Sequence, residues 1–389
     1  MAENVFSNNK KVKMIAGAVY DQVPYLKKAT SYMTQGELDG KKYGKTYDVY
    51  ITDPGKAVEG IVADPDTITE VKVPVTLDNI NTSIETNVWN NLTDIEDFKR
   101  EIVRPRATML ARSLEKKAIN GTVFKACQAS VGSANFATLA EAAGKLDEVG
   151  VAGTKVSFIK PTVGAKIAAG GLANFIPDDI QKKIYAEKYL GQYAGAAQVE
   201  ESLLPVVDAT DISAAAAAVT LTEAGSGAGF APITSASVTG PKAGWAFSAD
   251  GLKIVDKNGI QTDQDYIIVI DKDGNIPELR ITVDGQGYGN PNAWVESGTS
   301  SLTLSPILTE GKKYLVGQVR TQDALGFDTY KFADLPGSEN ATESVDGLSI
   351  KMSQYGNGNK MEVLTRLDIP HAFTLPDARN AALMYFEQA

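Results

Sequence analysis

Two stretches near the start of the chain alternate strictly between apolar and polar residues. The apolar positions are Tyr47, Val49 and Ile51 in the first stretch and Val71, Val73, Val75 and Leu77 in the second. Strict alternation predicts strands with one buried face, and the turn-forming residues from Asp53 to Pro65 predict that the two strands form a long hairpin. Two strands are too thin to bury their own apolar face. The hairpin therefore lies either on its own domain or across a neighbouring subunit, and the pattern leaves both interpretations open.

The clearest helical pattern runs from Thr93 to Asn120. Thr93 and Glu96 form a capping box, in which both side chains satisfy free backbone donors at the start of a helix. Apolar residues follow at helical spacing, and Pro105 predicts a kink or a restart near Arg104. The basic residues of this helix are Lys99, Arg100, Arg104, Arg106, Arg112, Lys116 and Lys117.

Other helices and strands surround this basic helix. The patterns predict a short helix around Val12 to Val23, a helix from Phe136 to Val149, a buried strand from Lys155 to Ile159 and a helical stretch from Pro177 to Tyr189. The strand is expected to end at Pro161. Helices and strands in this irregular order favour the α+β fold class.

The pattern changes at about residue 208. Five alanines, Ala214 to Ala218, precede a run rich in glycine and serine, and turn signals recur from there to about residue 310. These signals are Asp250-Gly251, Asn258-Gly259, Asp273-Gly274 and Asp284-Gly285. Closely spaced hairpin turns predict a small all-β unit. The α+β pattern resumes with Tyr314 to Phe332, so the β-rich unit is predicted to be an insertion.

Composition places the chain among ordinary globular proteins, because 43% of its 389 residues are hydrophobic and 22% are charged. The formal net charge of −10 argues against tight binding of nucleic acid, since an acidic surface repels phosphates. The single cysteine, Cys127, excludes an internal disulfide and fits a reducing cytoplasm. No apolar run is long enough to span a membrane, and no secretory signal is expected.

Three glycine-rich or acidic motifs come close to known binding loops and fail on spacing. Gly40 to Thr46 has three residues between its glycines where a P-loop needs about four, and it precedes a strand. Asp271 to Asn275 resembles the start of a calcium loop, but Ile276 and Thr282 stand where glycine and glutamate are needed. Gly285 to Gly289 lacks the dinucleotide-binding spacing. A hairpin turn explains the acidic motif better.

The remaining candidates for chemistry are a single histidine and several carboxylate pairs. One His and one Cys cannot supply the ligands of a structural zinc site. His371 stands in an apolar stretch, which favours a packed or surface histidine over a catalytic base. The pairs Asp178/Asp179, Glu200/Glu201 and Asp263/Asp265 are expected by chance among 48 acidic residues. The sequence therefore predicts no catalytic, cofactor or metal site and no enzyme activity.

The order of the predicted pieces resembles a known family. A loose arm, a long hairpin, a long basic helix, an α+β body and a late β-rich insertion resemble the Hong Kong phage-type capsid fold of tailed bacteriophages. The likeness is greatest to coat proteins of short-tailed phages that carry an insertion domain. The strings that carry it, in order, are Phe158-Ile159-Lys160-Pro161, Ile176-Pro177, Tyr193-Ala194-Gly195, Ser202 to Val206, Asp346 to Ile350, Thr365 to Ile369 and Pro376 to Arg379.

This resemblance implies a division of the chain into six segments. They are an N-terminal arm (1–40), an extended hairpin loop (41–92), a peripheral domain with a spine helix (93–150), the first part of an axial domain (151–207), a β-rich insertion domain (208–310), and the C-terminal part of the axial and peripheral domains (311–389).

The resemblance also implies a structural function. The protein would be a major capsid protein, whose copies self-assemble as pentamers and hexamers into the icosahedral shell that encloses the phage genome in the virion. The chain has no long helical N-terminal extension, which implies a separate scaffolding protein. The procapsid, assembled in the host cytoplasm, would expand on DNA packaging. The other implied partners are a portal protein and double-stranded DNA held by weak non-specific contacts, with no membrane and no cofactor.

Residues of the hairpin and of the basic helix are expected at the contacts between subunits, where the basic residues of the helix could pair with acidic neighbours or, alternatively, face the packaged genome. They are Tyr47, Val49, Ile51, Lys56, Glu59, Val71, Val73, Val75, Arg100, Arg104 and Arg112. One alternative is an encapsulin-like nanocompartment shell, which would lack the insertion. A second is a β-rich surface or carbohydrate-binding protein, which the stretch from Phe230 to Leu304 suggests and which should carry a signal peptide.

Overall fold

The computed structural model describes residues 7–32, 46–52, 70–87, 103–169, 192–193, 195–212, 218–221, 233–236, 240–273, 279, 281–283, 291–296, 299, 301–357 and 362–388. The chain divides into two compact units. The first unit is Met1–Val49, Pro74–Ile119 and Leu325–Thr374, and the second is Tyr50–Val73, Asn120–Ala324 and Leu375–Ala389. The division of the sequence into six segments stays a prediction.

A five-stranded antiparallel sheet forms the body of the first unit. Its strands are β3 (Asp78–Asn87), β17 (Gly326–Thr329), β18 (Glu339–Val345), β19 (Leu348–Asn357) and β20 (Glu362–Thr374). The long strand β20 is central, because β3 pairs along one side of it and β19 along the other. The inward residues Leu367 and Ile369 are fully buried, so this strand holds the core of the unit.

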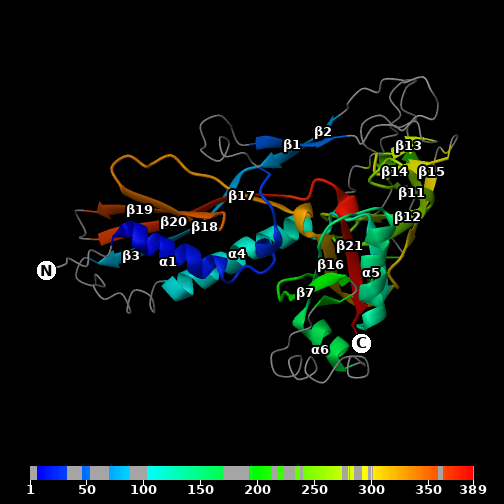
Figure 1. The fold of residues 1–389 in the computed structure, drawn as a ribbon, viewed down its shortest axis with the longest axis horizontal. Helices are drawn as coiled ribbons and strands as arrows, with labels where there is room; N and C mark the ends of the chain where they lie inside the picture. Colours follow the sequence, from blue (N-terminus) through cyan, green and yellow to red (C-terminus); the bar gives the residue numbers. More distant parts are fainter. Residues whose placement is uncertain are drawn as a thin grey trace. The chain divides into compact units, whose positions relative to one another are not determined.

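Two helices accompany this sheet. Helix α1 (Asn8–Tyr20) lies against β18 and β19 (Figure 1). It confirms the short helix predicted around Val12 to Val23. The helix begins earlier than predicted, because its first turn is polar and carries no apolar signal. It also ends earlier than predicted, at Tyr20. Helix α4 (Arg104–Thr122) has Pro105 in its first turn, where a proline removes no helical hydrogen bond. The capping box at Thr93 lies outside the described residues.

The predicted hairpin strands are present. β1 (Thr46–Thr52) and β2 (Glu70–Thr76) form a two-stranded sheet, and the predicted tip, Asp53 to Pro65, lies outside the described residues. The boundary between the two units falls within both strands. The base of the hairpin, up to Val49 in β1 and from Pro74 in β2, belongs to the first unit.

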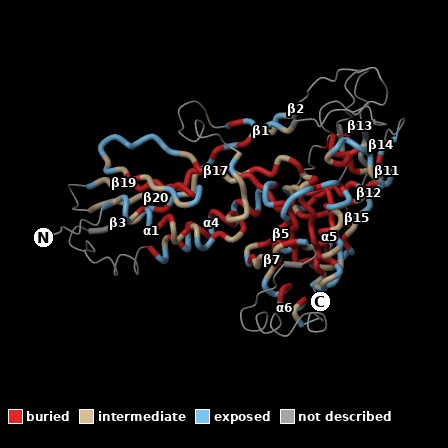
Figure 2. The backbone as a smooth tube through the Cα atoms, in the orientation of Figure 1, coloured by how far each residue is buried: buried red, intermediate tan, exposed pale blue. Residues whose placement is uncertain are grey.

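A seven-stranded mixed sheet forms the body of the second unit. Its strands are β4 (Gln128–Gly132), β5 (Lys155–Ile159), β6 (Gln192–Tyr193), β7 (Ala196–Glu200), β8 (Val206–Asp208), β16 (Lys313–Thr321) and β21 (Ala381–Glu387). Strands β16 and β21 are central and almost wholly buried (Figure 2). Helix α5 (Phe136–Glu148) packs on β4 and β21.

Local sequence patterns predict part of this unit. The helix from Phe136 and the buried strand from Lys155 to Ile159 are confirmed. A further helix, α6 (Pro161–Ala169), was not foreseen. Pro161 ends the strand as predicted, and it also occupies the first helical position, for which its fixed backbone angle is suited. The predicted stretch from Pro177 to Tyr189 lies outside the described residues.

A second seven-stranded sheet confirms the β-rich stretch between residues 208 and 310. Its strands are β9 (Ala218–Leu221), β10 (Ile233–Ala236), β11 (Ala246–Val255), β12 (Gln261–Val269), β13 (Ile281–Val283), β14 (Ala293–Val295) and β15 (Ser301–Pro306). Asp208 at the end of β8 pairs with Lys313 at the start of β16. The chain therefore leaves and re-enters the body sheet at neighbouring positions.

One turn predicted within this stretch is wrong. Asp250-Gly251 lies inside β11, where the pairing with β12 shifts register between Ser248 and Lys253. Gly251 has a φ of +82°, and such backbone produces a bulge as readily as a turn. Both units contain helices as well as sheets, so the molecule is α+β.

Candidate functional site

The base of the hairpin is fixed in the first unit by apolar packing. Tyr47, Val49, Val75 and Leu77 form one buried cluster with Ala372 of β20. The rings of Tyr32 and Tyr330 pack against this cluster. The base of the hairpin therefore lies on its own domain, which was one of the two interpretations of the sequence pattern.

The distal half of the hairpin is less covered. Tyr50 is 52% exposed, and Ile51, Val71 and Val73 are half-buried. The ammonium group of Lys72 lies 5.5 Å from the centre of the Tyr50 ring. Apolar side chains in this half thus remain available to a further surface.

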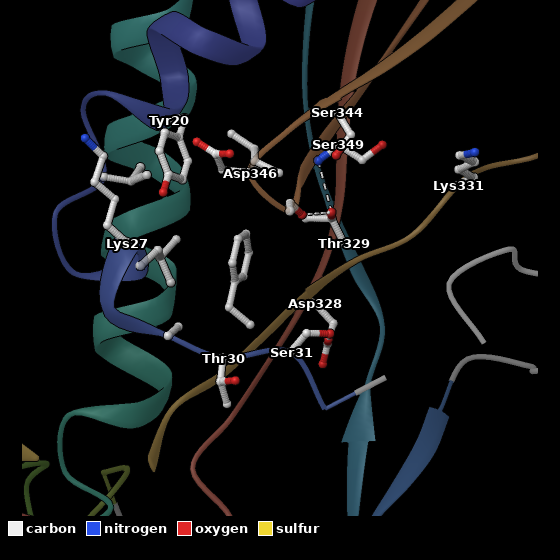
Figure 3. A pocket seen from close by; sticks show the side chains of 16 residues that line it. Tyr20, Lys27, Thr30, Ser31, Asp328, Thr329, Lys331, Ser344, Asp346 and Ser349 are labelled. Carbon is white, nitrogen blue, oxygen red and sulfur yellow. Dashed lines mark hydrogen bonds between the residues drawn. The ribbon is translucent and has the colours of Figure 1, made fainter. Parts of the chain in front are cut away.

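A buried carboxylate connects the hairpin to two other segments. Asp328 of β17 is 1% exposed. Its Oδ2 accepts a hydrogen bond from the Tyr47 hydroxyl at 2.8 Å, and its Oδ1 accepts from the Ser31 hydroxyl at 2.5 Å and the Tyr32 amide at 3.2 Å. Figure 3 shows Ser31 and Asp328 facing each other. One side chain thus joins β17, the segment after α1 and the first hairpin strand.

The segment after α1 also pairs with β17 through its backbone. The Thr30 amide donates to the Leu325 carbonyl at 2.9 Å, and the Phe327 amide donates to the Thr30 carbonyl at 2.8 Å. Gly326 leaves room for this approach, because a Cβ there would collide with the Tyr32 ring and would lie 2.7 Å from Thr374 Cγ2. The segment is therefore held by a strand-like pairing that requires glycine.

A cavity of about 520 Å³ lies beside this pairing, between the segment after α1 and the turn that joins β18 to β19 (Figure 3). The Thr329 hydroxyl donates to the Gly347 carbonyl at 2.6 Å and accepts from the Ser349 amide at 3.0 Å. Asp346 and Gly347 form the turn with φ values of 46° and 87°, which a two-residue hairpin turn requires. The described lining of the cavity contains no His or Cys.

The exposed face of α4 carries positive charge. Arg104, Arg112, Lys116 and Lys117 are exposed. Lys117 pairs with Asp78 of β3. The acidic residue of this helix, Glu115, is 2% exposed and accepts a hydrogen bond from the Tyr25 amide at 2.7 Å. The helix is thus apolar on its inner face and basic on its outer face.

The predicted contact residues fall into three groups. Tyr47, Val49 and Val75 lie together in the buried base of the hairpin. Ile51, Val71 and Val73 lie in its half-covered part, while Arg104 and Arg112 lie on the separate outer face of α4. Lys56, Glu59 and Arg100 lie outside the described residues. A role of these residues in contacts between subunits stays a prediction.

His371 is a packed side chain in the first unit. Its Nδ1 lies 2.9 Å from the Ile369 carbonyl, and its ring centre lies 4.8 Å from that of Phe373. Burial lowers the pKa of His371, and Lys117 adds to this effect, against smaller opposing effects of the Ile369 carbonyl and Asp78. The imidazole is therefore neutral at pH 7.

A buried ionic cluster joins the C-terminal segment of the second unit to the β-rich insertion. The Arg379 guanidinium donates to Asp377 at 2.9 Å and to the Asp256 carbonyl at 2.7 Å, and Lys257 contacts the same carboxylate at 2.5 Å. Burial by itself would raise the pKa of Asp377, but the two cations hold it below its ordinary value. Burial, with a contribution from Asp377, raises the pKa of Cys127 to about 12, so this thiol is unreactive.

The described residues also bear on metal sites and on membrane-spanning helices. No group of three or more His, Cys, Asp or Glu side chains among the described residues could hold a metal ion. None of the described helices combines the length and the apolar character needed to cross a bilayer. The calcium-like motif from Asp271 lies at the end of β12, and only part of it is described.

No family model and no curated protein matches the chain. Among solved structures, the chain is similar to Mycobacterium phage Che8, with 10% sequence identity, a TM-score of 0.45, and coverage of 88% of this chain and 85% of that chain. It is similar to the capsid structure of the cyanophage P-SCSP1u, with 11% identity, a TM-score of 0.45, and coverage of 92% and 90%. It is also similar to the holo-SrpI encapsulin complex from Synechococcus elongatus, with 10% identity, a TM-score of 0.38, and coverage of 93% and 86%. The solved structures similar to this chain are mainly phage capsids.

Proposed function

We propose that the protein is the major capsid protein of a tailed phage, and that its copies assemble into an icosahedral shell around the genome. The observation that carries this function is the hairpin of β1 and β2. Its base is packed into its own unit, whereas Ile51, Val71 and Val73 further out are covered only in part. An element that is anchored at its base and half-covered beyond it is suited to bind a neighbouring copy.

The order of the elements supports the same function. The hairpin, a long helix with one buried face, a body sheet and a β-rich sheet follow one another along the chain. This is the order that the sequence resemblance to phage coat proteins implies. A shell protein acts through surfaces and needs no reacting groups, so we expect no enzymatic activity.

The expected partners follow from this function. Copies of one chain close a shell when heterologous contacts repeat around symmetry axes, as pentamers and hexamers. A scaffolding protein would guide the procapsid, a portal protein would occupy one vertex, and double-stranded DNA would fill the shell in the virion. Expansion on DNA packaging would be a rearrangement between two packings of the same subunits.

The two alternatives differ from this function in ways that an experiment can separate. An encapsulin-like shell would enclose an enzyme in place of nucleic acid, and the separate sheet formed by β9 to β15 counts against it. A β-rich surface or carbohydrate-binding protein would form no closed shell. Whether a closed shell forms, and whether it contains nucleic acid or an enzyme, therefore distinguishes the three functions.

Charged substitutions in the distal half of the hairpin test the proposed contact. We expect Val71→Asp with Val73→Asp to give a folded chain that forms no shells, because a buried unpaired carboxylate opposes association. The matched control is Ile260→Asp, which places a carboxylate on a side chain that is 63% exposed in the insertion. Shell yield is measured by sedimentation and negative-stain electron microscopy.

Normal shells from the double hairpin variant would contradict the contact. Circular dichroism and thermal unfolding establish whether both variants are folded. We expect the control to form shells in the same yield as the unmodified chain.

A further inference from the structure

We infer that His371 is a proton-operated switch for the base of the hairpin. When the imidazole takes up a proton, the pairing of β20 with β3 and β17 loosens around it, and the hairpin base is released from its own unit. The residues that form this switch all lie in the first unit.

Three strands meet at His371, beside the base of the hairpin. In the register of the sheet, His371 of β20 stands between Thr329 of β17 and Asp78 of β3. Ala372 follows His371 in the chain and belongs to the buried cluster that fixes the hairpin base. Leu77, in the same cluster, precedes Asp78. Successive side chains of a strand point to opposite faces, so the imidazole and the hairpin base lie on opposite faces of the same part of β20.

One ring nitrogen of His371 is hydrogen-bonded and the other is not. The Nδ1 lies 2.9 Å from the Ile369 carbonyl, which can only accept, so Nδ1 carries the proton of the neutral ring. The Nε2 is shielded from solvent and has no hydrogen-bond partner among the described residues. A second proton would bind at Nε2 and would create a buried charged donor without an acceptor, which is strongly unfavourable.

The carboxylates on the two neighbouring strands already have partners. Asp78, opposite His371 on β3, contacts the ammonium group of Lys117 from α4. Asp328 of β17 accepts a hydrogen bond from the Tyr47 hydroxyl at 2.8 Å. The ammonium group beside Asp78 repels a positive charge on the imidazole.

The remaining titratable groups of the adjoining elements are engaged as well. Glu115 of α4 is buried and holds a backbone amide. The Tyr330 hydroxyl, after β17, donates to the Asp78 carbonyl at 3.4 Å. Asp368 of β20 itself accepts from the Arg366 guanidinium at 2.8 Å. The closed arrangement is therefore built around a neutral imidazole.

The sign of the pH effect follows from these surroundings. Burial, with a contribution from Lys117, lowers the pKa of His371 in the folded chain against the opposing effects of the Ile369 carbonyl and Asp78. In an opened segment the imidazole regains its ordinary pKa of about 6.5. The closed arrangement therefore has its full stability above about pH 6.5 and loses stability as the pH falls below that value.

Opening at His371 acts on the hairpin through the backbone of β20. A protonated imidazole must turn toward solvent, which separates β20 from β3 and β17 at this row and displaces Ala372 from the hairpin-base cluster. The hairpin, whose distal half is proposed to bind a neighbouring copy, would then be held at neutral pH and released in mild acid. That consequence for assembly rests on the proposed function, whereas the release itself does not.

Hydrogen exchange of the soluble full-length chain tests the switch without any shell. Deuterium uptake of peptides that cover β1, β2 and β3 is measured by mass spectrometry at about pH 7.5 and about pH 5.5, a range in which an ordinary histidine titrates. Each rate is corrected for the intrinsic pH dependence of amide exchange. Peptides from β16 and β21 of the second unit serve as the internal reference. The chain has one histidine, so a response in this range is assigned by substitution of a single residue.

We expect opening of the hairpin base to increase several-fold on acidification, up to about tenfold, because an imidazole with a pKa of about 6.5 is protonated in about tenfold excess at pH 5.5. The reference strands should show no such increase. Equal opening at the two pH values would overturn the inference, and so would an equal increase in both units, which would show general unfolding.

Two substitutions of the histidine remove the proton-binding group. His371→Asn keeps a side-chain N–H for the Ile369 carbonyl, and His371→Phe keeps a ring beside Phe373. We expect the increase on acidification to be absent in both variants. An increase that persists in either variant, once circular dichroism has shown it to be folded, would overturn the inference.

A substitution of Lys117 tests the switch with the histidine in place, even where a His371 variant does not fold. Lys117→Met removes the cation that occupies Asp78, so the protonated imidazole gains an acceptor and the increase on acidification should shrink. The matched control is Lys116→Met, which removes a charge from the neighbouring exposed residue of α4 and should leave the increase unchanged. Equal responses of the two lysine variants would contradict the switch.

Shell formation is measured separately on the unmodified chain, so the two conclusions can fail independently. A chain that opens in acid through His371 and forms no shells would contradict the proposed function and leave the switch intact. A chain that forms shells and shows no acid opening of the hairpin base would overturn the switch and leave the proposed function intact.

Discussion

At the scale of single residues, the buried carboxylates of Glu115 and Asp328 join segments that are far apart in the sequence. Glu115 holds the amide of Tyr25, which is 90 positions away, and Asp328 holds the hydroxyl of Tyr47, which is 281 positions away. A buried donor or acceptor that loses its partner destabilises a protein by about 1–3 kcal/mol. These residues therefore matter more for the fold than most exposed charges do.

Removal of the Asp328 carboxylate should release the base of the hairpin. Asp328→Ala removes the carboxylate that accepts hydrogen bonds from the Tyr47 hydroxyl, the Ser31 hydroxyl and the Tyr32 amide, so we expect the free energy of unfolding to fall by about 2–4 kcal/mol. The control is Asp263→Ala, an exposed residue of β12, for which a change within about 0.5 kcal/mol is expected. Urea denaturation gives both values, and similar values for the two variants would refute this role.

The buried pair of Asp377 and Arg379 predicts a pH dependence of stability. The folded-state pKa of Asp377 lies below its ordinary value, so the charged carboxylate stabilises the fold above the unfolded-state pKa of about 3.9, and this stabilisation is lost as the pH falls below it. Asp377→Asn should reduce the free energy of unfolding by about 3–5 kcal/mol at neutral pH. The difference from the unmodified chain should shrink between about pH 5 and pH 3. A difference that stays constant over this range would contradict the assignment.

At the scale of elements, short-range patterns predicted the hairpin strands, α5 and β5 because their periodicity is local. The same patterns missed α6, since Pro161 signals the end of a strand and the start of a helix equally well. They also took Asp250-Gly251 for a turn, where the register of β11 and β12 makes a bulge. Asp328 gave no signal, because its partners lie hundreds of positions away and the chain has 48 acidic residues.

The pairing of the segment after α1 with β17 depends on Gly326. Gly326→Ala would place a Cβ against the Tyr32 ring and Thr374, and we expect a loss of about 1–3 kcal/mol of stability from overpacking. Gly17→Ala is the control, because no atom lies within 4 Å of a Cβ at this position of α1. That change should stabilise the helix by about 0.5–1 kcal/mol. Calorimetric melting of both variants checks that the two changes in stability have opposite signs. An unchanged stability of Gly326→Ala would contradict the close approach of Tyr32 and Thr374 to Gly326.

At the scale of the whole molecule, the second unit contains a sheet, β9 to β15, that is inserted in the sequence between β8 and β16, two paired strands of the body sheet. Ala209 and Lys312 are hydrogen-bonded at this junction, with the Ala209 amide donating to the Lys312 carbonyl at 2.9 Å. Composition and turn spacing predicted the β-rich character of this stretch, but not its strand order, which depends on contacts between distant residues. The contacts between copies lie beyond a single chain, so for them the sequence and the fold supply candidates that experiment must test.

The most direct test of the shell function is electron microscopy of the full-length chain, produced alone and together with the scaffolding protein that we propose. We expect closed particles of uniform diameter with fivefold and sixfold clusters of subunits, and a reconstruction in which the distal half of the hairpin lies on a neighbouring copy. A preparation that contains folded monomers or small oligomers and no closed particles would contradict the account.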